Sequence, residues 1–252
     1  MNNRRNFLKN ATSLGVALAM APGLLKAADF NKPANDNGKD FTFLFQGDSI
    51  TDGGRGRNND WNHVMGQDYA YLISSRLWYD FPHKDFHFFN RGISGNKVTD
   101  LAARWQTDTL DLKPDVLSIL IGINDTSAWI NGDKNFTVEE YESGYRSLLQ
   151  QTKQQLPNIK FVLCQPFVLP VGRVKEKWQE YESGVLQRQE ISKRLAVEFD
   201  AIYIPFQEAL NKALKKAPAE YWIWDGVHPM PAGHELMARE WIKGVNKKLK
   251  LF

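Results

Sequence analysis

Short apolar runs that alternate with amphipathic stretches dominate the chain after residue 40. Aromatic residues at 41, 43 and 45, with Leu44 between them, fit a strand that is covered on both faces, as parallel strands usually are. This run stops at Gly47-Asp48-Ser49, and similar runs follow further along the chain. The later predicted strands are 86–90, 116–121, 160–165 and 201–205.

Helical patterns fall between these predicted strands. Residues 69–77 repeat apolar side chains at helical spacing, Thr137 begins a helix that Pro157 ends, and residues 175–199 form a long charged helix. A closing helix begins near Pro231, and its inward residues are Leu236, Trp241 and Val245. Strands that alternate with helices predict a parallel sheet with right-handed crossovers.

Polar residues follow three of the predicted strands at the point where each strand ends. Gly47-Asp48-Ser49 follows the first strand, Arg91 to Asn96 the second, and Gly122-Ile123-Asn124-Asp125 the third. Ligands bind at the carboxyl ends of strands in open α/β sheets, so these groups are candidates for a site. Gly-Asp-Ser alone is equally compatible with a turn in which Ser49 caps a helix.

The length of 252 residues and the ordinary apolar and charged fractions favour a single domain with one sizeable core. Cys164 is the single cysteine, which excludes an internal disulfide. It lies in the apolar run 161–164, so we expect a core residue rather than a nucleophile.

The amino terminus has the pattern of an export signal. Arg4-Arg5 precedes a mildly apolar stretch that ends before residue 29, and the arginine pair resembles the bacterial twin-arginine signal. The stretch is too short for a membrane-spanning helix, so we expect no stable membrane anchor. We predict a signal at residues 1–28, a solvated lead-in at 29–40, and one domain from 41 to 252, located in the periplasm or secreted.

Export changes the meaning of the net charge. Loss of residues 1–28 removes four basic residues and no acidic one, which takes the formal net charge from +3 to −1. The basic character of the chain therefore belongs largely to the predicted signal, and nucleic-acid binding loses its main support.

Asp225 and His228 are three residues apart, close enough for the carboxylate to hold one ring nitrogen while the other nitrogen faces a nucleophile. Ser49 can supply that nucleophile, because a serine hydroxyl becomes reactive when a base takes its proton. Asp-x-x-His alone is more typical of a histidine packed in a loop than of a catalytic pair.

Four sequence blocks in order carry a resemblance to a known family. They are Gly47-Asp48-Ser49, Asn90-x-Gly92-x-Ser94-Gly95, Gly122-x-Asn124-Asp125 and Asp225-x-x-His228. Together they resemble the SGNH hydrolases, also called the GDSL family, over essentially all of residues 41–252. The α/β-hydrolase elbow G-x-S-x-G does not fit, because Thr51 stands where the second glycine would be.

The resemblance implies a fold, an activity and roles for these residues. The fold would be a three-layer α/β/α sandwich with a five-stranded parallel sheet in the flavodoxin-like order 2-1-3-4-5. The activity would be ester hydrolysis without a cofactor, with Ser49 as nucleophile, His228 as general base and acid, and Asp225 as its orienting carboxylate. The N–H groups of Ser49 and Gly95 and the side-chain amide of Asn124 would form the oxyanion hole.

Other candidate residues fit this picture less well. His83 and His87 have helical metal-ligand spacing, but Pro82 precedes both and a predicted strand follows, so we expect no metal site. Arg55 and Arg57 could bind an acidic group of a substrate or could simply be solvated.

The ester itself is less constrained than the reaction. An exported enzyme meets polysaccharide or phospholipid more readily than a cytoplasmic thioester, and we expect polar loops at 50–67 and 125–136 rather than an apolar lid. Tryptophan rings suit the apolar faces of sugars, and at least one of the two beside Asp225 should instead belong to the core. The candidates are Trp61, Trp129, Trp222 and Trp224.

The leading interpretation is therefore removal of O-acetyl groups from a small ester or an acetylated glycan. The alternatives are a lysophospholipase or general short-chain esterase and, from another class, a noncatalytic exported glycan-binding protein. The pattern predicts no oligomeric state.

Overall fold

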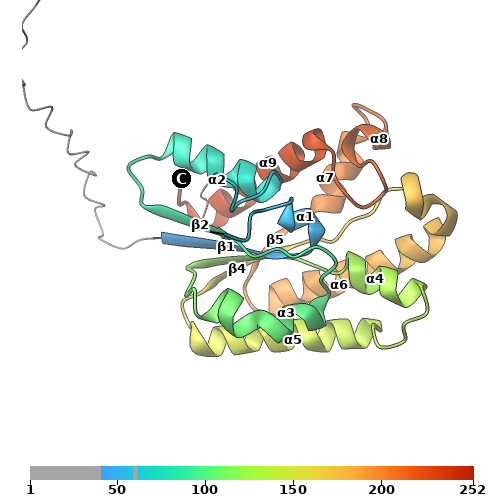
Figure 1. Ribbon diagram of the computed structural model, residues 1–252, viewed down its shortest axis with the longest axis horizontal. Helices are drawn as coiled ribbons and strands as arrows, with labels where there is room; N and C mark the ends of the chain where they lie inside the picture. The colour runs from blue at the N-terminus through green and yellow to red at the C-terminus, as the bar shows by residue number, and fades with distance from the viewer. Residues whose placement is uncertain (1–40, 59–61) are drawn as a thin grey trace, which may run out of the picture. The chain divides into compact units, whose positions relative to one another are not determined.

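The computed structural model describes residues 41–58 and 62–252. Within these residues one sheet of five parallel strands has the order β2-β1-β3-β4-β5 (Figure 1). The predicted α/β fold and its flavodoxin-like strand order are confirmed. The strands are β1 (Phe41–Gly47), β2 (Phe86–Asn90), β3 (Val116–Leu120), β4 (Lys160–Cys164) and β5 (Ile202–Ile204).

Helices cover both faces of the sheet and make the three-layer sandwich seen in Figure 1. One face carries α2 (Tyr69–Asp80), α7 (Phe206–Ala213) and α9 (Pro231–Leu249). The opposite face carries α3 (Val98–Trp105), α5 (Val138–Gln155) and α6 (Trp178–Glu198). Shorter helices are α1 (Ser49–Asp52), the π-helical turn η1 (Gln106–Leu110), α4 (Ile123–Ile130), the 3₁₀ helix η2 (Gly172–Lys177) and α8 (Ala219–Trp222).

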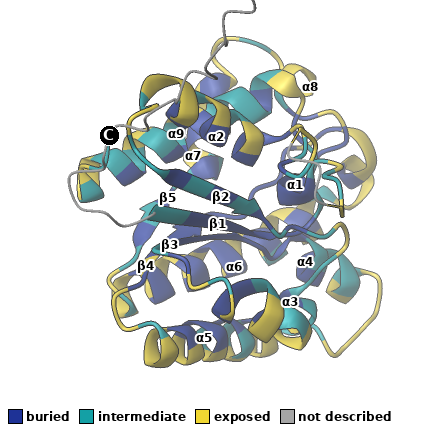
Figure 2. Cartoon of the chain, turned by 60° about the vertical axis from the view of Figure 1, so that its left-hand side comes forward, coloured by how far each residue is buried: buried dark blue, intermediate teal, exposed yellow. Residues whose placement is uncertain are grey.

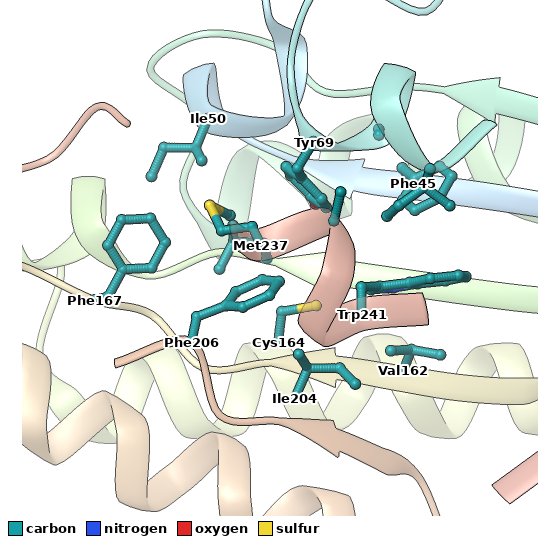
Figure 3. Packing of buried hydrophobic residues seen from close by; sticks show 14 of the residues in the cluster. Phe45, Ile50, Tyr69, Val162, Cys164, Phe167, Ile204, Phe206, Met237 and Trp241 are labelled. Carbon is teal, nitrogen blue, oxygen red and sulfur yellow. The ribbon is translucent and has the colours of Figure 1, made fainter. Parts of the chain in front are cut away.

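Separate apolar clusters lie on the two faces of the sheet, which is buried between the helical layers (Figure 2). Phe43 and Phe45 point to the cluster of α2, α7 and α9, whereas Leu44 points to the other cluster, as alternation along a strand requires. Trp241 of α9 packs on Phe45 with ring centroids 5.4 Å apart (Figure 3). Cys164 lies in the same cluster and is 1% exposed, so the prediction of a core cysteine is confirmed.

Two details of the predicted elements are wrong. Residues 123–130 form helix α4 instead of the start of a polar loop. Its polar side chains bond within the helix, because the Thr126 hydroxyl donates to the Gly122 carbonyl and the Ser127 hydroxyl to the Ile123 carbonyl. In α9, Leu236 is only partly buried and Met237 takes the inward position.

The predicted signal and lead-in, residues 1–40, lie outside the described residues and stay predictions. In the part of the chain that the structure describes, no helix combines the length and apolar character that crossing a membrane requires.

Candidate active site

Ser49 stands at the carboxyl end of β1, where the chain turns at once into α1 (Figure 1). The side-chain carboxyl group of Asp48 caps α1 by accepting a hydrogen bond from the Ile50 N–H at 3.0 Å, so Asp48 and not Ser49 is the helix cap. Gly47 allows the close approach of β3, because a Cβ there would lie 2.5 Å from the carbonyl oxygen of Leu120. The Ser49 hydroxyl is left free for contacts outside the sheet.

Asp225 and His228 lie in a tight loop between α8 and α9, which the bridge between Ile223 and Pro229 closes. One carboxylate oxygen of Asp225 accepts from the backbone N–H groups of Val227 and His228, at 2.9 and 2.7 Å. The other oxygen lies 2.7 Å from Nδ1 of the His228 ring. The carboxylate therefore fixes both the loop and the ring that the loop carries.

The structure brings Ser49 and this loop together across 179 positions of sequence, with Ser49 Oγ 2.8 Å from His228 Nε2. Burial alone would raise the pKa of Asp225, but the hydrogen bonds from the backbone and ring of His228 and from Val227 outweigh it and lower that pKa. An ionised Asp225 favours the tautomer with its proton on Nδ1. Nε2 can then accept the proton of the Ser49 hydroxyl.

Three possible hydrogen-bond donors, the N–H groups of Ser49 and Gly95 and the side-chain amide of Asn124, lie on segments that meet beside Ser49. The loop after β2, which carries Gly95, is held against the end of β1 because the Ile93 N–H donates to the Gly47 carbonyl at 3.1 Å. The Asn124 amide donates to the Asn96 carbonyl at 3.1 Å and keeps its second N–H for another acceptor. Within the described residues, the N–H groups of Ser49 and Gly95 donate to no other group.

Gly95 lies in open space with a positive φ of 84°, and a Cβ there would meet nothing within 4 Å. Gly95 is also exposed, so a substrate can approach its backbone from solvent. An acceptor near Ser49 Oγ could receive hydrogen bonds from Gly95, Ser49 and Asn124, which is what an oxyanion needs. Their catalytic roles stay predictions.

Buried carboxyl groups lie behind the site. Burial is the main cause that raises the pKa of Asp48 to about 7, the Ile50 N–H opposes it, and the nearby charge of Asp125 adds to it. Burial likewise raises the pKa of Asp125 to about 6, against the hydrogen bond from the Val98 N–H. Oδ2 of Asp48 is buried without a hydrogen-bond partner among the described residues. A protonated carboxyl fits that position better than a carboxylate, so Asp48 has the character of a structural group.

The predicted aromatic residues fall in different surroundings. Trp224 is 60% exposed, and its ring lies nearly parallel to that of His228 at 6.2 Å. Trp129 is 38% exposed, and Lys134 Nζ lies 3.9 Å from its ring centroid. Trp222 is partly buried against the core, and Trp61 lies outside the described residues.

Arg55 and Arg57 bind groups of the protein itself. Arg55 Nε donates to the Gly92 carbonyl at 2.9 Å, and Arg57 makes two hydrogen bonds to the carboxylate of Asp52, at 2.6 and 3.1 Å. The sequence analysis did not identify Asp52 as part of the site. Its position three residues after Ser49 could have indicated this role, because residues that are three apart on a short helix lie close together in space.

Arg173 is a second residue that the sequence analysis missed. Its Nε lies 3.1 Å from Asp225 Oδ2, the same oxygen that faces His228. Arg173 sits in η2, and no sequence pattern links it to a loop more than fifty positions later. Sequence alone could not have found this ion pair.

No group of three or more metal-binding side chains gathers anywhere in residues 41–58 and 62–252. His87 Nε2 instead lies 3.4 Å from the carboxylate of Asp85. The Nδ1 atom of His234 accepts from the Tyr69 N–H at 3.2 Å, and burial lowers the pKa of this ring to about 4. These two histidines are explained by local structure.

Comparisons with known proteins agree with this geometry. The model of the GDSL-like Lipase/Acylhydrolase family matches residues 45–236. An acetylxylan esterase from Geobacillus stearothermophilus is 34% identical over 216 residues, which are 80% of this chain and 92% of that protein.

Solved structures give the same result. A structure described as a GDSL-like lipase from Parabacteroides merdae has a TM-score of 0.79 and 42% identity, and the match covers 83% of this chain and 97% of that one. A catalytic mutant of Axe2, an acetylxylan esterase from Geobacillus stearothermophilus, has a TM-score of 0.73 and 33% identity, with 81% and 94% coverage. This chain therefore belongs to the GDSL-like lipase/acylhydrolase family, the SGNH hydrolases, and is a carboxylic ester hydrolase.

Proposed function

We propose that this esterase removes O-acetyl groups from carbohydrates, with Ser49 as nucleophile, His228 as general base and acid, and Asp225 as the carboxylate that orients it. The observation that carries the proposal is the 34% identity to an acetylxylan esterase over 80% of the chain. Membership of a family that includes lipases does not by itself indicate which ester is the substrate. Similarity over nearly the whole length of the acetylxylan esterase favours an acetylated carbohydrate.

The contacts of Ser49 and His228 support a two-step acyl transfer. Ser49 Oγ attacks the acetyl carbonyl carbon while His228 Nε2, 2.8 Å away, takes the hydroxyl proton. The carbonyl oxygen becomes negative and accepts hydrogen bonds from Ser49 N–H, Gly95 N–H and the Asn124 amide. Collapse breaks the bond to the sugar oxygen, which leaves with the proton from Nε2. Water then attacks acetyl-Ser49 in the same way and releases acetate.

Trp224 supports a sugar as the leaving group. Its exposed ring lies beside the ring of His228, the residue that would give the leaving hydroxyl its proton. An aromatic face can stack on the apolar face of a pyranose. Trp129 is the weaker platform, because Lys134 already occupies one face of its ring.

Acetate release tests the proposal. The purified enzyme is incubated with acetylated xylan, acetylated xylo-oligosaccharides, other acetylated polysaccharides, p-nitrophenyl acetate and a lysophospholipid. We expect turnover of at least one acetylated glycan and none by Ser49→Ala. Hydrolysis of p-nitrophenyl acetate or lysophospholipid without any release from glycans would overturn the carbohydrate assignment. A folded protein that binds glycans but hydrolyses no ester would contradict catalysis itself.

A substitution at Trp224 separates substrate binding from chemistry. Trp224→Ala should raise KM for the glycan severalfold while kcat on p-nitrophenyl acetate stays within about twofold. Tyr79→Ala is the matched control, since Tyr79 is 85% exposed on α2 and none of the contacts described above involves it. Equal effects of the two substitutions would remove Trp224 from the substrate site.

A further inference from the structure

Asp52 lies at the end of α1, three residues after Ser49, and is only 3% exposed. Its Oδ2 atom accepts two hydrogen bonds from Ser94, one from the backbone N–H at 2.9 Å and one from the hydroxyl at 3.1 Å. Ser94 immediately precedes Gly95. A carboxylate three residues after the nucleophile thus holds Ser94, the residue before the proposed oxyanion donor Gly95.

Arg57 holds Asp52 from the solvent side. Its two terminal nitrogens bind the two oxygens of Asp52, at 3.1 and 2.6 Å, while its own side chain is 49% exposed. Such a bidentate pair fixes the plane of the carboxylate as well as its charge. Burial alone would raise the pKa of Asp52, but the hydrogen bonds from Arg57 and Ser94 lower it. Asp52 is therefore ionised under neutral assay conditions.

The backbone of the Gly95 loop also packs directly against α1. A Cβ at Gly92 would lie 2.4 Å from the Asp52 nitrogen, and the Gly92 carbonyl accepts from Arg55. Gly95 itself has no side chain, a positive φ and open space where a Cβ would lie, so no side chain of its own packs to fix the direction of its N–H. The restraint on that N–H comes from its neighbours: Asp52 holds Ser94 on one side, and the Ile93 carbonyl and the Asn124 amide hold Asn96 on the other.

We propose that Asp52, held by Arg57, is a positioning residue that acts through Ser94 to aim the Gly95 N–H at the developing oxyanion. This inference rests on the oxyanion hole of the proposed function. It assigns Arg57 to the protein's own architecture and not to an acidic group of the substrate. A misdirected donor weakens transition-state binding while ground-state binding is kept, so the loss should appear in kcat.

The test is steady-state hydrolysis of p-nitrophenyl acetate and of an acetylated xylo-oligosaccharide by Asp52→Asn, Arg57→Ala, Arg57→Lys and Ser94→Ala. We expect kcat to fall by about 10- to 100-fold for Asp52→Asn and by about tenfold for Arg57→Ala, with KM within twofold. Arg57→Lys should recover only part of the loss, because an ammonium cannot pair with both oxygens. Arg194→Ala is the matched control, since Arg194 is a half-exposed arginine that pairs with Glu142.

A double-mutant cycle identifies the route. If Asp52 acts through the Ser94 hydroxyl, the loss caused by Asp52→Asn should shrink when Ser94 is already alanine. Additive losses would assign the effect to the Ser94 N–H, which alanine keeps. A kcat within twofold of wild type for both Asp52→Asn and Arg57→Ala would overturn the proposal. A rise in KM restricted to acidic glycans, with kcat unchanged, would instead assign Arg57 to substrate binding.

Two outcomes keep this inference separate from the proposed function. If the wild type hydrolyses p-nitrophenyl acetate but no glycan, the substrate assignment fails and the cycle still decides the role of Asp52. If Asp52→Asn does not fold, Arg57→Ala decides, because its half-exposed side chain can be removed without opening the core.

Discussion

Two of the polar groups around Ser49 are held by partners that lie far away in the sequence. Asp52 and Ser94 are 42 positions apart, and Asn124 and Asn96 are 28 apart. The strand ends bring them together, so the position of Asn124 after a buried strand could be predicted from its sequence. The bond from Asn124 to Asn96, which leaves one amide N–H unused, could not be.

Asn124 gives a prediction that isolates the oxyanion hole. Asn124→Ala removes a donor and should lower kcat by on the order of 10² to 10³, with a much smaller change in KM. Asn124→Asp should be at least as damaging, because a carboxylate cannot donate and adds negative charge where one is forming. Steady-state kinetics on p-nitrophenyl acetate measure both. A kcat within a few fold of wild type for Asn124→Ala would make Asn124 a turn-forming residue only.

Asp48 gives a prediction about pH and stability. Its pKa of about 7 in the folded protein lies above the unfolded value near 4, so folding favours the protonated carboxyl. The stability that it contributes is complete below about pH 4 and is lost as the pH rises through about 7. Asn at this position keeps an oxygen for the Ile50 N–H and never ionises.

The measurement is thermal unfolding of wild type and Asp48→Asn at pH 5, 6, 7 and 8. The Tm of the variant relative to wild type should rise by several degrees across this range. The unpartnered amide nitrogen lowers stability equally at every pH, so the comparison is one of slopes. A constant difference in Tm would show that Asp48 is already ionised at pH 5.

Elements were predictable where apolar periodicity was strong. β1, β3 and β4 are mostly apolar runs, and α5 has the N-cap Thr137, whose hydroxyl accepts from the Glu140 N–H at 3.1 Å. α4 lacked such a signal because it contains Asn, Asp, Thr and Ser, which favour turns over helix interiors. Tertiary packing supplies the missing stability, and Gly184 of α6 lets Thr126 of α4 approach closely.

The segment between β4 and α6 contacts the loop that carries Asp225 and His228. The Leu169 N–H donates to the Gly226 carbonyl at 3.0 Å, and Arg173 pairs with Asp225. Gly172 has a positive φ of 55°, and a Cβ there would lie 2.4 Å from the Cα of Asp225. The two loops are therefore in backbone contact, and their positions should change together.

Gly172→Ala tests this contact. The methyl group must push η2 away from Asp225, and displacement of the His228 ring should lower kcat roughly tenfold or more. Gly132→Ala is a matched control, because Gly132 also has a positive φ, of 97°, but a Cβ there meets nothing within 4 Å. Backbone strain alone acts in both variants. Equal kcat values for the two variants would mean that the contact between Gly172 and Asp225 does not position the site.

At the scale of the whole molecule, the described residues form a folded domain from Phe41 onward, and the export signal is predicted at residues 1–28. Arg4 and Arg5 contribute to the positive charge that the domain lacks, since the formal net charge changes from +3 to −1 without residues 1–28. A polysaccharide substrate lies outside the cell. Export and carbohydrate deacetylation are therefore linked proposals, and either one weakens if the other fails.

The arginine pair can be tested without changing charge. Replacement of Arg4 and Arg5 together by lysine keeps both positive charges but removes the planar guanidinium groups that a receptor can distinguish. In a bacterial host with a twin-arginine export system, we expect esterase activity to move from the periplasmic or secreted fraction to the cytoplasm. Lys26→Arg, a change of the same type near the end of the predicted signal, should leave export intact. Unchanged export of the double-lysine variant would exclude a twin-arginine signal. It would then favour a general secretory signal at residues 1–28.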